Sequence, residues 1–128
     1  MKIVTWNCAG AFRKKHQALI HFNADILVIQ ECEDPGQSSV NYQDFAGVDY
    51  LWKGKNKHKG IGVFARNGHQ LRKLKWLDRD LELFLPCRID ERFNLLGVWT
   101  KASTSPKLSY IQQFAKYLQI HKKKAITR

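Results

Sequence analysis

The sequence has few cysteines, no long apolar run and no secretory-signal pattern. Its three cysteines, Cys8, Cys32 and Cys87, are odd in number and lack CxxC spacing, so free thiols are expected rather than disulfides or a thiolate metal site. No apolar stretch approaches the ~20 residues of a membrane-spanning helix. The chain opens directly into a strand-like segment, without the apolar core of a signal peptide. We therefore expect a cytoplasmic protein without a membrane partner.

Acidic residues are also scarce. Against 22 lysines and arginines there are 11 aspartates and glutamates, which gives a formal net charge of +11. Such a balance favours anionic partners, with nucleic acid first among them. A generically soluble basic protein has the same balance, so charge alone does not decide between these two interpretations.

The length and the apolar content fit one globular domain. A chain of 128 residues lies within the usual range of a single domain, and a chain of this size buries roughly 65–70% of its unfolded surface. The hydrophobic fraction of 44% is ordinary for a globular protein. No internal repeat or low-complexity linker divides the chain, so residues 1–128 are expected to form a single domain.

Two short apolar runs near the start organise the chain. Residues 2–7 and 26–31 are rich in β-branched side chains, and each is followed by a turn signal, so both are predicted to be buried strands. Helical spacing in residues 12–22 predicts a helix between them. A strand–helix–strand unit makes its strands parallel, so Asn7 and Glu31 should meet at the edge where ligands bind in open α/β sheets. A carboxylate and an amide there could hold Mg²⁺ and a phosphate oxygen.

The rest of the chain is predicted to be mostly strands joined by turns. A loop with a short helical turn near residues 42–45 precedes strands over 50–53, 61–66, 71–77, 81–89 and 92–100. Asn67-Gly68 is a hairpin turn signal. A final helix begins at Ser105-Pro106 and ends in lysines 122–124. The predicted fold class is α+β, with a mixed sheet of about six or seven strands that carries two helices on one face.

Three segments resemble the opening of a known superfamily. Thr5-Trp6-Asn7, then Ile29-Gln30-Glu31, then Lys59-Gly60-Ile61-Gly62-Val63 resemble the start of the endonuclease/exonuclease/phosphatase superfamily. The resemblance implies a DNase I-like fold, which is a four-layer α/β sandwich, and a metal-dependent phosphoesterase activity. It covers the whole chain but only the N-terminal part of such a domain, roughly one half. The family's later Gly-Asp-Phe-Asn and Ser-Asp-His type motifs are missing.

The resemblance assigns roles to two residues. Glu31 matches the magnesium-ligating glutamate, and Asn7 matches the asparagine beside the metal and the scissile phosphate. Without the resemblance, Glu31 would be a solvated residue at a strand end and Asn7 a turn-forming asparagine. The functional interpretation is preferred because Glu31 closes a wholly apolar run and follows Gln30 in the family's pattern, and because Asn7 is paired with Trp6 and Glu31 in that pattern. Neither residue can activate water, so a hydrolase also needs the general base and the oxyanion stabiliser of the missing part.

One turn concentrates basic residues, and it precedes the third segment of the resemblance. A phosphate-contacting surface is one interpretation, and a solvated, lysine-rich loop is about equally supported. The nucleic-acid-binding candidates in this turn are Lys53, Lys55, Lys57, His58 and Lys59.

The sequence therefore predicts part of a Mg²⁺-dependent (or Mn²⁺-dependent) phosphodiester hydrolase that acts as a nuclease and is inactive alone. The alternative is a non-catalytic nucleic-acid-binding or assembly module built from half the fold. In the family's abasic-site nucleases a Thr-Lys pair follows the Gln-Glu motif. Cys32-Glu33 stands there in this chain, which argues against an abasic-site role.

A half-fold is also expected to leave one sheet face without a cover. The side chains of that face, or their alternating neighbours, would then expose a large apolar patch. A two-fold homodimer through this uncovered sheet face is the simplest remedy. The side chains expected there are Val4, Trp6, Val63 and Leu96.

Overall fold

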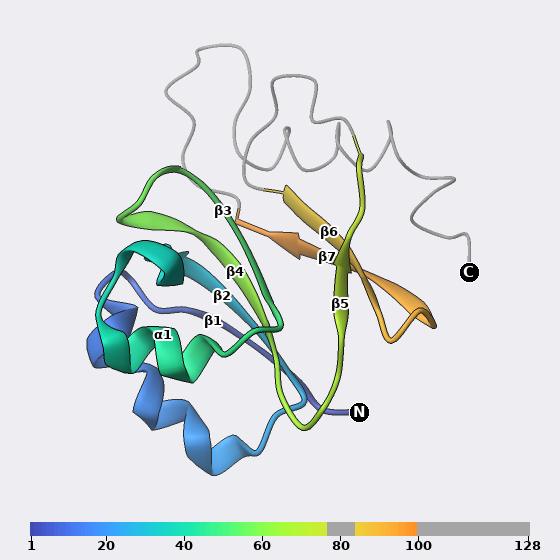
Figure 1. Ribbon diagram of the computed structural model, residues 1–128, viewed down its shortest axis with the longest axis horizontal. Coiled ribbons are helices and arrows are strands. Elements are labelled where there is room, and N and C mark those ends of the chain that lie inside the picture. The colour runs from blue at the N-terminus through green and yellow to red at the C-terminus, as the bar shows by residue number, and fades with distance from the viewer. Residues whose placement is uncertain (77–83, 100–128) are drawn as a thin grey trace.

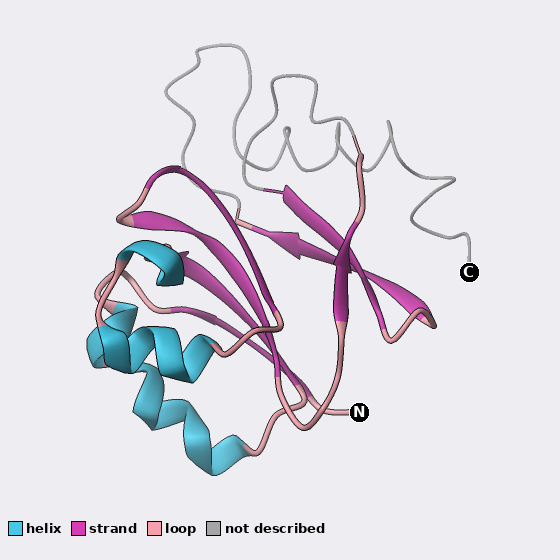
Figure 2. Cartoon of the chain, in the orientation of Figure 1, coloured by secondary structure: helices cyan, strands magenta, loops and turns pink. Residues whose placement is uncertain are grey.

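A computed structural model describes residues 1–76 and 84–99 of the chain. In this part a four-stranded sheet and a three-stranded sheet pack together, and short helices cover the outer face of the larger sheet (Figures 1 and 2). The larger sheet contains, in spatial order, β1 (Ile3–Asn7), β2 (Ile26–Cys32), β4 (Lys59–Ala65) and β3 (Tyr50–Asn56). The smaller sheet contains β5 (Leu71–Lys73), β6 (Phe84–Ile89) and β7 (Phe93–Val98). The predicted α+β class with a mixed sheet is confirmed for these residues.

The predicted strand–connection–strand unit is confirmed. β1 pairs with β2 in parallel, with Ile3 opposite Ile26 and Asn7 opposite Gln30. The connection is not one α-helix, however, but two 3₁₀ helices, η1 (Phe12–Lys14) and η2 (His16–Phe22). Neither begins with a side-chain cap, and a single turn residue, Lys15, separates them. Without a capping side chain, the first turn of a longer helix is poorly stabilised.

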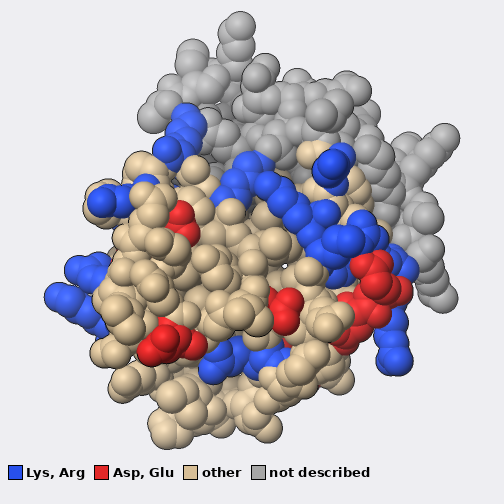
Figure 3. Space-filling model, in the orientation of Figure 1, with Lys and Arg blue, Asp and Glu red and all other residues tan. Residues whose placement is uncertain are grey.

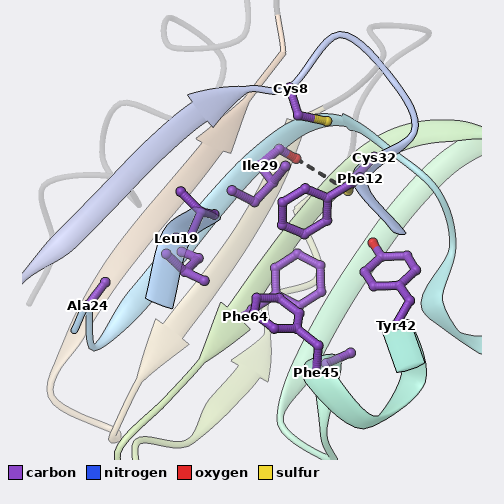
Figure 4. Packing of buried hydrophobic residues seen from close by; sticks show 11 residues of the cluster. Cys8, Phe12, Leu19, Ala24, Ile29, Cys32, Tyr42, Phe45 and Phe64 are labelled. Carbon is purple, nitrogen blue, oxygen red and sulfur yellow. Dashed lines mark hydrogen bonds between the residues drawn. The ribbon is translucent and has the colours of Figure 1, made fainter. Parts of the chain in front are cut away.

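Aromatic side chains form the core between the larger sheet and the helices (Figure 4). Phe12 is fully buried at its centre and makes edge-to-face contacts with Trp6, Tyr42 and Phe45. Such pairs add about 0.5–1.5 kcal/mol each beyond their buried area. Tyr42 and Phe45 belong to α1 (Val40–Ala46), which follows the short η3 (Pro35–Gln37). The short helical turn predicted near residues 42–45 is therefore confirmed.

A second core lies between the two sheets, and it corrects the expectation of a single sheet with a bare face. Ile26 and Val63 of the larger sheet pack against Leu85 and Ile89 of the smaller one. Val63, expected to be uncovered, is fully buried. The chain supplies its own second sheet, so the uncovered face that was the reason to expect a homodimer is absent from the described residues. The homodimer itself stays a prediction.

The other side chains of that expectation are not bare either. Val4 and Trp6 pack on the helix side of the larger sheet, and Leu96 is half-buried. All three therefore have neighbours from their own chain.

The Asn67-Gly68 turn shows why the strands divide into two sheets. Both residues have the positive φ values, 56° and 82°, that this dipeptide adopts readily. The turn does not close a hairpin, however, because β4 and β5 belong to different sheets. The Asn67 amide donates to Asp25, just before β2, at 2.9 Å. Nδ1 of His69 then lies 2.6 Å from Oδ2 of Asp90, in the turn between β6 and β7. Long-range side-chain bonds thus redirect a turn that would otherwise form a hairpin.

The predicted helix over residues 105–124 lies wholly outside the described residues. The predicted strands over residues 71–77, 81–89 and 92–100 lie partly outside them. No helix in the described ranges is long and apolar enough to cross a membrane.

Candidate active site

β2 contains a β-bulge close to its C-terminal end, and Glu31 is the extra residue of this bulge. Gln30 lies opposite Ile61 of β4 and Cys32 lies opposite Gly60, so the register shifts at Glu31. Glu31 has a left-handed backbone with a φ of 63°. Such a conformation costs a non-glycine residue roughly 1–2 kcal/mol, and bulges of this kind often re-aim a side chain beside an active site.

The helix-side core explains why the bulge must occur. Ile29 and Cys32 are both fully buried there, although strict alternation would place two residues three apart on opposite faces. Figure 4 shows both side chains in this core, with the Cys32 thiol directed at the Ile29 carbonyl. The extra residue, Glu31, is thereby excluded from the core, and its side chain is 22% exposed.

Asn7 ends β1 beside this bulge, as the sequence predicts. Its Oδ1 accepts a hydrogen bond from the backbone N–H of Ala9 at 3.0 Å. Ala9, Gly10 and Ala11 then follow with φ values of 59°, 90° and 52°. Three successive left-handed residues make a tight turn, which the side chain of Asn7 holds at its start. Asn7 therefore does form a turn, as one interpretation of the sequence predicted. The hydrogen bond from Ala9 fixes the orientation of the Asn7 side-chain amide.

Lys59 joins the Asn7 turn to Glu31. Its Nζ lies 3.8 Å from Oε1 of Glu31. A Cβ placed on Gly10 would lie 3.6 Å from Cε of Lys59, so the lysine side chain runs along the turn. The structure thus brings Asn7, Glu31 and one predicted basic residue, Lys59, together at the carboxyl ends of β1 and β2.

Gln30 anchors this edge to the second sheet. Its Nε2 donates to Oγ1 of Thr5 at 3.0 Å and to the carbonyl of Val98 at 3.1 Å. One side chain therefore links β1, β2 and β7 directly behind the bulge. The position next to Glu31 is held from both sheets, as a preorganised site requires.

Glu33 is a residue of this region to which the sequence analysis gave no role in the site. It is buried, and it accepts from the guanidinium of Arg13 at 2.7 Å and from the Arg13 backbone N–H at 3.4 Å. Burial alone would raise the pKa of Glu33, but the Arg13 side chain and the backbone donors outweigh it and hold the pKa below its ordinary value. Two features of the sequence could have pointed to Glu33. It is an acidic residue directly after Cys32, and residues 13–15, in the connection between β1 and β2, are all basic.

The other predicted basic residues are distributed along the β3–β4 hairpin. Lys55, Lys57 and His58 are exposed. Lys53 is half-buried, and its Nζ donates to the carbonyl of Phe84 in β6 at 3.4 Å. The structure therefore places one end of the predicted basic set near Glu31 and the other end against the smaller sheet.

Trp52 supports the hairpin rather than presenting a free ring. Its Nε1 donates to the Cys32 carbonyl at 3.1 Å, and the ring packs against the helix-side core. Trp52 therefore has a packing role in this core.

The described residues fit a sparse magnesium site better than a thiolate site. Within residues 1–76 and 84–99, no group of three or more His, Cys, Asp or Glu side chains could hold a metal ion. Mg²⁺ is often bound by one or two carboxylates plus water and phosphate oxygens, and Glu31 suits that role. Cys8 lies nearby, but its thiol donates to the Gln30 and Glu31 carbonyls, and burial raises its pKa above the ordinary value. A neutral thiol is a poor metal ligand.

Comparisons with known proteins support the fold. No family model and no curated protein matches the chain. A solved structure described as the 3′ phosphatase NExo from Neisseria, bound to a product DNA hairpin, matches with a TM-score of 0.59 and 24% identity, over 95% of this chain and 49% of that chain. The 3′-5′ exonuclease NExo from Neisseria meningitidis matches with a TM-score of 0.59 and 23% identity over the same shares.

At this identity the likeness concerns the fold, and it supports the DNase I-like fold that the resemblance implied. The chain spans about half the length of the structures that it matches.

Proposed function

We propose that the chain is the N-terminal part of a phosphodiester hydrolase that uses Mg²⁺ or Mn²⁺ and acts on nucleic acid. The observation that carries the proposal is the bulge at the end of β2, which excludes Glu31 from the core and presents its carboxylate beside Asn7 and Lys59. Exonuclease and 3′ phosphatase structures of the same fold give the reaction class.

Each residue has a separate role in the proposal. Glu31 would be the protein carboxylate of the metal site, and a bound Mg²⁺ would act as a Lewis acid toward a phosphate oxygen. Asn7 has its Oδ1 engaged by Ala9, so its amide N–H groups are what it offers to a phosphate. Lys59, 3.8 Å from Glu31, would exchange its carboxylate contact for the negative charge of the substrate.

In the roles that the proposal gives them, none of these three side chains acts as a general base for water, because Glu31 would hold the metal and Lys59 would be a cation. The proposal therefore includes that the 128-residue chain is inactive alone and that the remaining catalytic groups lie outside the described residues. The hairpin residues Lys55, Lys57 and His58 would contact the phosphate backbone next to the site.

The metal site is tested by NMR titration of the full chain with Mg²⁺ and Mn²⁺. We expect weak, roughly millimolar binding, with shifts and paramagnetic broadening centred on Glu31 and Asn7. Glu31→Gln should abolish these effects, while the matched variant Glu91→Gln, in the β6–β7 turn, should keep them. Broadening confined to Asp34 or Glu91 would disprove the assignment.

The second candidate function is a non-catalytic nucleic-acid-binding or assembly module. The net charge of +11 favours it, and so does the lack, within the described residues, of any group of three or more side chains that could hold a metal ion. It predicts duplex binding that Glu31→Gln leaves unchanged and no metal effect at Glu31. The coding sequence after Arg128 separates the two candidates, because only the hydrolase requires Gly-Asp-Phe-Asn and Ser-Asp-His type motifs there.

A homodimer is a separate expectation of this proposal. Sedimentation equilibrium at micromolar concentration tests it, and a monomer with a cooperative thermal transition would refute it.

A further inference from the structure

Two edge strands carry the same pattern of residues, although they belong to different sheets. In β3, a leucine and two lysines occupy alternate positions: Leu51, Lys53 and Lys55. The same order occurs in β5 and the two residues that follow it: Leu71, Lys73 and Lys75. Alternate residues of a strand share a face. Leu51 and Leu71 both pack against the core between the sheets. Lys53 and Lys73 therefore continue this inter-sheet face outward. Lys55, at the irregularity between Gly54 and Asn56, and Lys75, after the end of β5, follow them along the chain.

The two rows of lysines lie on the same side of the molecule. β3 is an edge strand of the larger sheet, β5 is an edge strand of the smaller one, and the two strands contact each other. Lys53 reaches across the gap, since its Nζ donates to the carbonyl of Phe84 at the start of β6. The backbone N–H of Leu74 donates to Pro86 of the same strand at 3.0 Å, which brings Lys75 toward this start. We call these four residues, Lys53, Lys55, Lys73 and Lys75, the lysine seam.

The surface shows the result as a continuous positive band. Figure 3 shows lysine and arginine side chains extending from the region of β3 across to β5, in the upper right of the view. Lys55, Lys73 and Lys75 are exposed. Arg72 of β5, next to Lys73, is paired with Glu91 in a two-pronged contact at 2.5 and 3.0 Å.

The lysine seam also leads to the candidate active site. Along β3, Lys53 and Lys55 precede the hairpin turn, and Lys59 follows that turn beside Glu31. Alternate lysines on a strand are about 6.6 Å apart. The positive charge thus forms a path that begins at β5, crosses to β3 and ends at the bulge.

We propose that the lysine seam binds the phosphate backbone of a nucleic acid and directs the strand toward Glu31. The direction of the path rests on the proposed function, but the binding itself requires no metal and no catalysis. Lys73 and Lys75 are the new part of this surface, because they lie far from the β3–β4 turn in sequence and belong to the other sheet.

The test measures the binding of the full chain to a fluorescein-labelled duplex DNA of arbitrary sequence, by anisotropy over a range of salt concentrations and with EDTA present. The seam variant is Lys73→Gln with Lys75→Gln. The matched control is Lys2→Gln with Lys14→Gln. It removes the same charge from two exposed positions, one directly before β1 and one in η1.

Each lysine that neutralises a duplex phosphate adds about 0.9 to the slope of log affinity against log salt. The seam variant should therefore lower that slope by roughly 1.8 and weaken binding roughly fivefold to tenfold per lysine near 0.1 M salt. The control variant should change both values much less, and Lys73→Arg with Lys75→Arg should restore binding.

Equal losses in the seam and control variants would mean that net charge alone governs binding, and would overturn the proposal. No loss in the seam variant would overturn it as well, and so would tighter binding of the unmodified chain to phosphatidylserine vesicles than to the duplex. Thermal unfolding of each variant shows whether it is folded, and the arginine variant keeps the test valid if glutamine destabilises the chain. The binding test contains EDTA and the metal titration contains no DNA, so either proposal can fail alone.

Discussion

Arg13 and Glu33 form an ion pair that fastens the turn after β1 to the end of β2. A guanidinium nitrogen of Arg13 lies 2.7 Å from Oε2 of Glu33, whose side chain is only 8% exposed. The backbone N–H of Arg13 points at the same carboxylate. Glu33 therefore holds the start of η1, and with it the Ala9–Ala11 turn that contains the partner of Asn7.

Removing the arginine side chain should destabilise the fold, because a mostly buried carboxylate would lose its charged partner. Arg13→Ala should lower the free energy of unfolding by about 1–3 kcal/mol, measured by urea denaturation at pH 7. Lys14→Ala, at the exposed neighbouring residue, should change it by less than about 0.5 kcal/mol.

The same pair has a pH signature. Because the folded pKa of Glu33 is lowered, its contribution to stability is present above the ordinary pKa and is lost as the pH falls through the lowered value. In Arg13→Ala the pKa should rise, so this loss should begin at a higher pH. Superimposable acid-unfolding curves for the two proteins would contradict the role given to Arg13.

His69 forms a bridge between the two sheets that should depend on pH. Its Nδ1 lies 2.6 Å from Oδ2 of Asp90 after β6, and its Nε2 lies 3.3 Å from Oδ1 of Asp25 before β2. The contact with Asp90 is the main reason that the pKa of His69 is raised. The stability from this bridge is fully present below the ordinary histidine pKa and is lost as the pH rises through the raised one.

We therefore expect the urea midpoint to fall as the pH rises from 6 to 9. His69→Gln should flatten this fall, because glutamine does not titrate. His58→Gln, at an exposed hairpin histidine, should leave the fall intact. A fall of the same size in His69→Gln would assign it to other groups.

His16 should act in the opposite direction. It is buried among aromatic rings, with its ring centre 4.5 Å from that of Phe45. Its Nδ1 has no hydrogen-bond partner in the part of the chain that the structure describes. Burial, and then the charge of Arg66, lower the pKa of His16. Stability is therefore lost as the pH falls below the ordinary histidine pKa toward the lowered one, because the unfolded chain takes up the proton more readily.

His16→Leu, which is close to histidine in volume, should stabilise the protein by about 1 kcal/mol at pH 7, since it removes a buried polar atom without a partner. It should also remove the loss of stability between pH 7 and pH 5. The measurement is urea denaturation at both pH values, with the exposed His21→Leu as control. A destabilised His16→Leu would mean that the imidazole contributes more through its ring contacts than its unpaired nitrogen costs.

The parts of the fold that depend on local pattern were predictable from the sequence. The parallel pairing of β1 with β2 follows from two apolar runs and the length of the chain between them, and the structure confirms its register. The division into two sheets was not predictable in the same way. It depends on Asn67 and His69 reaching Asp25 and Asp90, and such long-range bonds leave no periodic trace in the sequence.

The candidate site was predictable in its residue types but not in its geometry. Asn7 and Glu31 could be placed at one edge because parallel strands end on the same side. The bulge that presents Glu31 could not, because the sequence does not reveal that Ile29 and Cys32 share one core. Glu33 was missed for a related reason, since its burial depends on Arg13, which lies 20 residues away.

Trp52 lies over a pair of facing glycines, and this packing supports the bulge. Gly54 of β3 is opposite Gly60 of β4. A Cβ on Gly54 would lie 2.6 Å from Cη2 of Trp52, and one on Gly60 would meet the Lys53 carbonyl and lie 2.5 Å from Cζ2 of Trp52. The indole can therefore lie flat only over two residues that lack side chains.

Gly60→Ala should consequently force the indole or the backbone to move, at a cost of about 1–3 kcal/mol in the free energy of unfolding. Because the Trp52 Nε1 donates to the carbonyl of Cys32, directly after the Glu31 bulge, the indole N–H resonance of Trp52 should shift as that bond weakens. Gly36→Ala is the matched control, since its added Cβ would lie 3.4 Å from the nearest atom, at ordinary contact distance. Stability and the indole resonance should both stay near their original values in that control. If Gly60→Ala were as stable as the unmodified chain and kept its Trp52 resonance, the position of the indole ring would not depend on the glycine pair. The bulge at Glu31 would then be supported by the Gln30 contacts and not by Trp52.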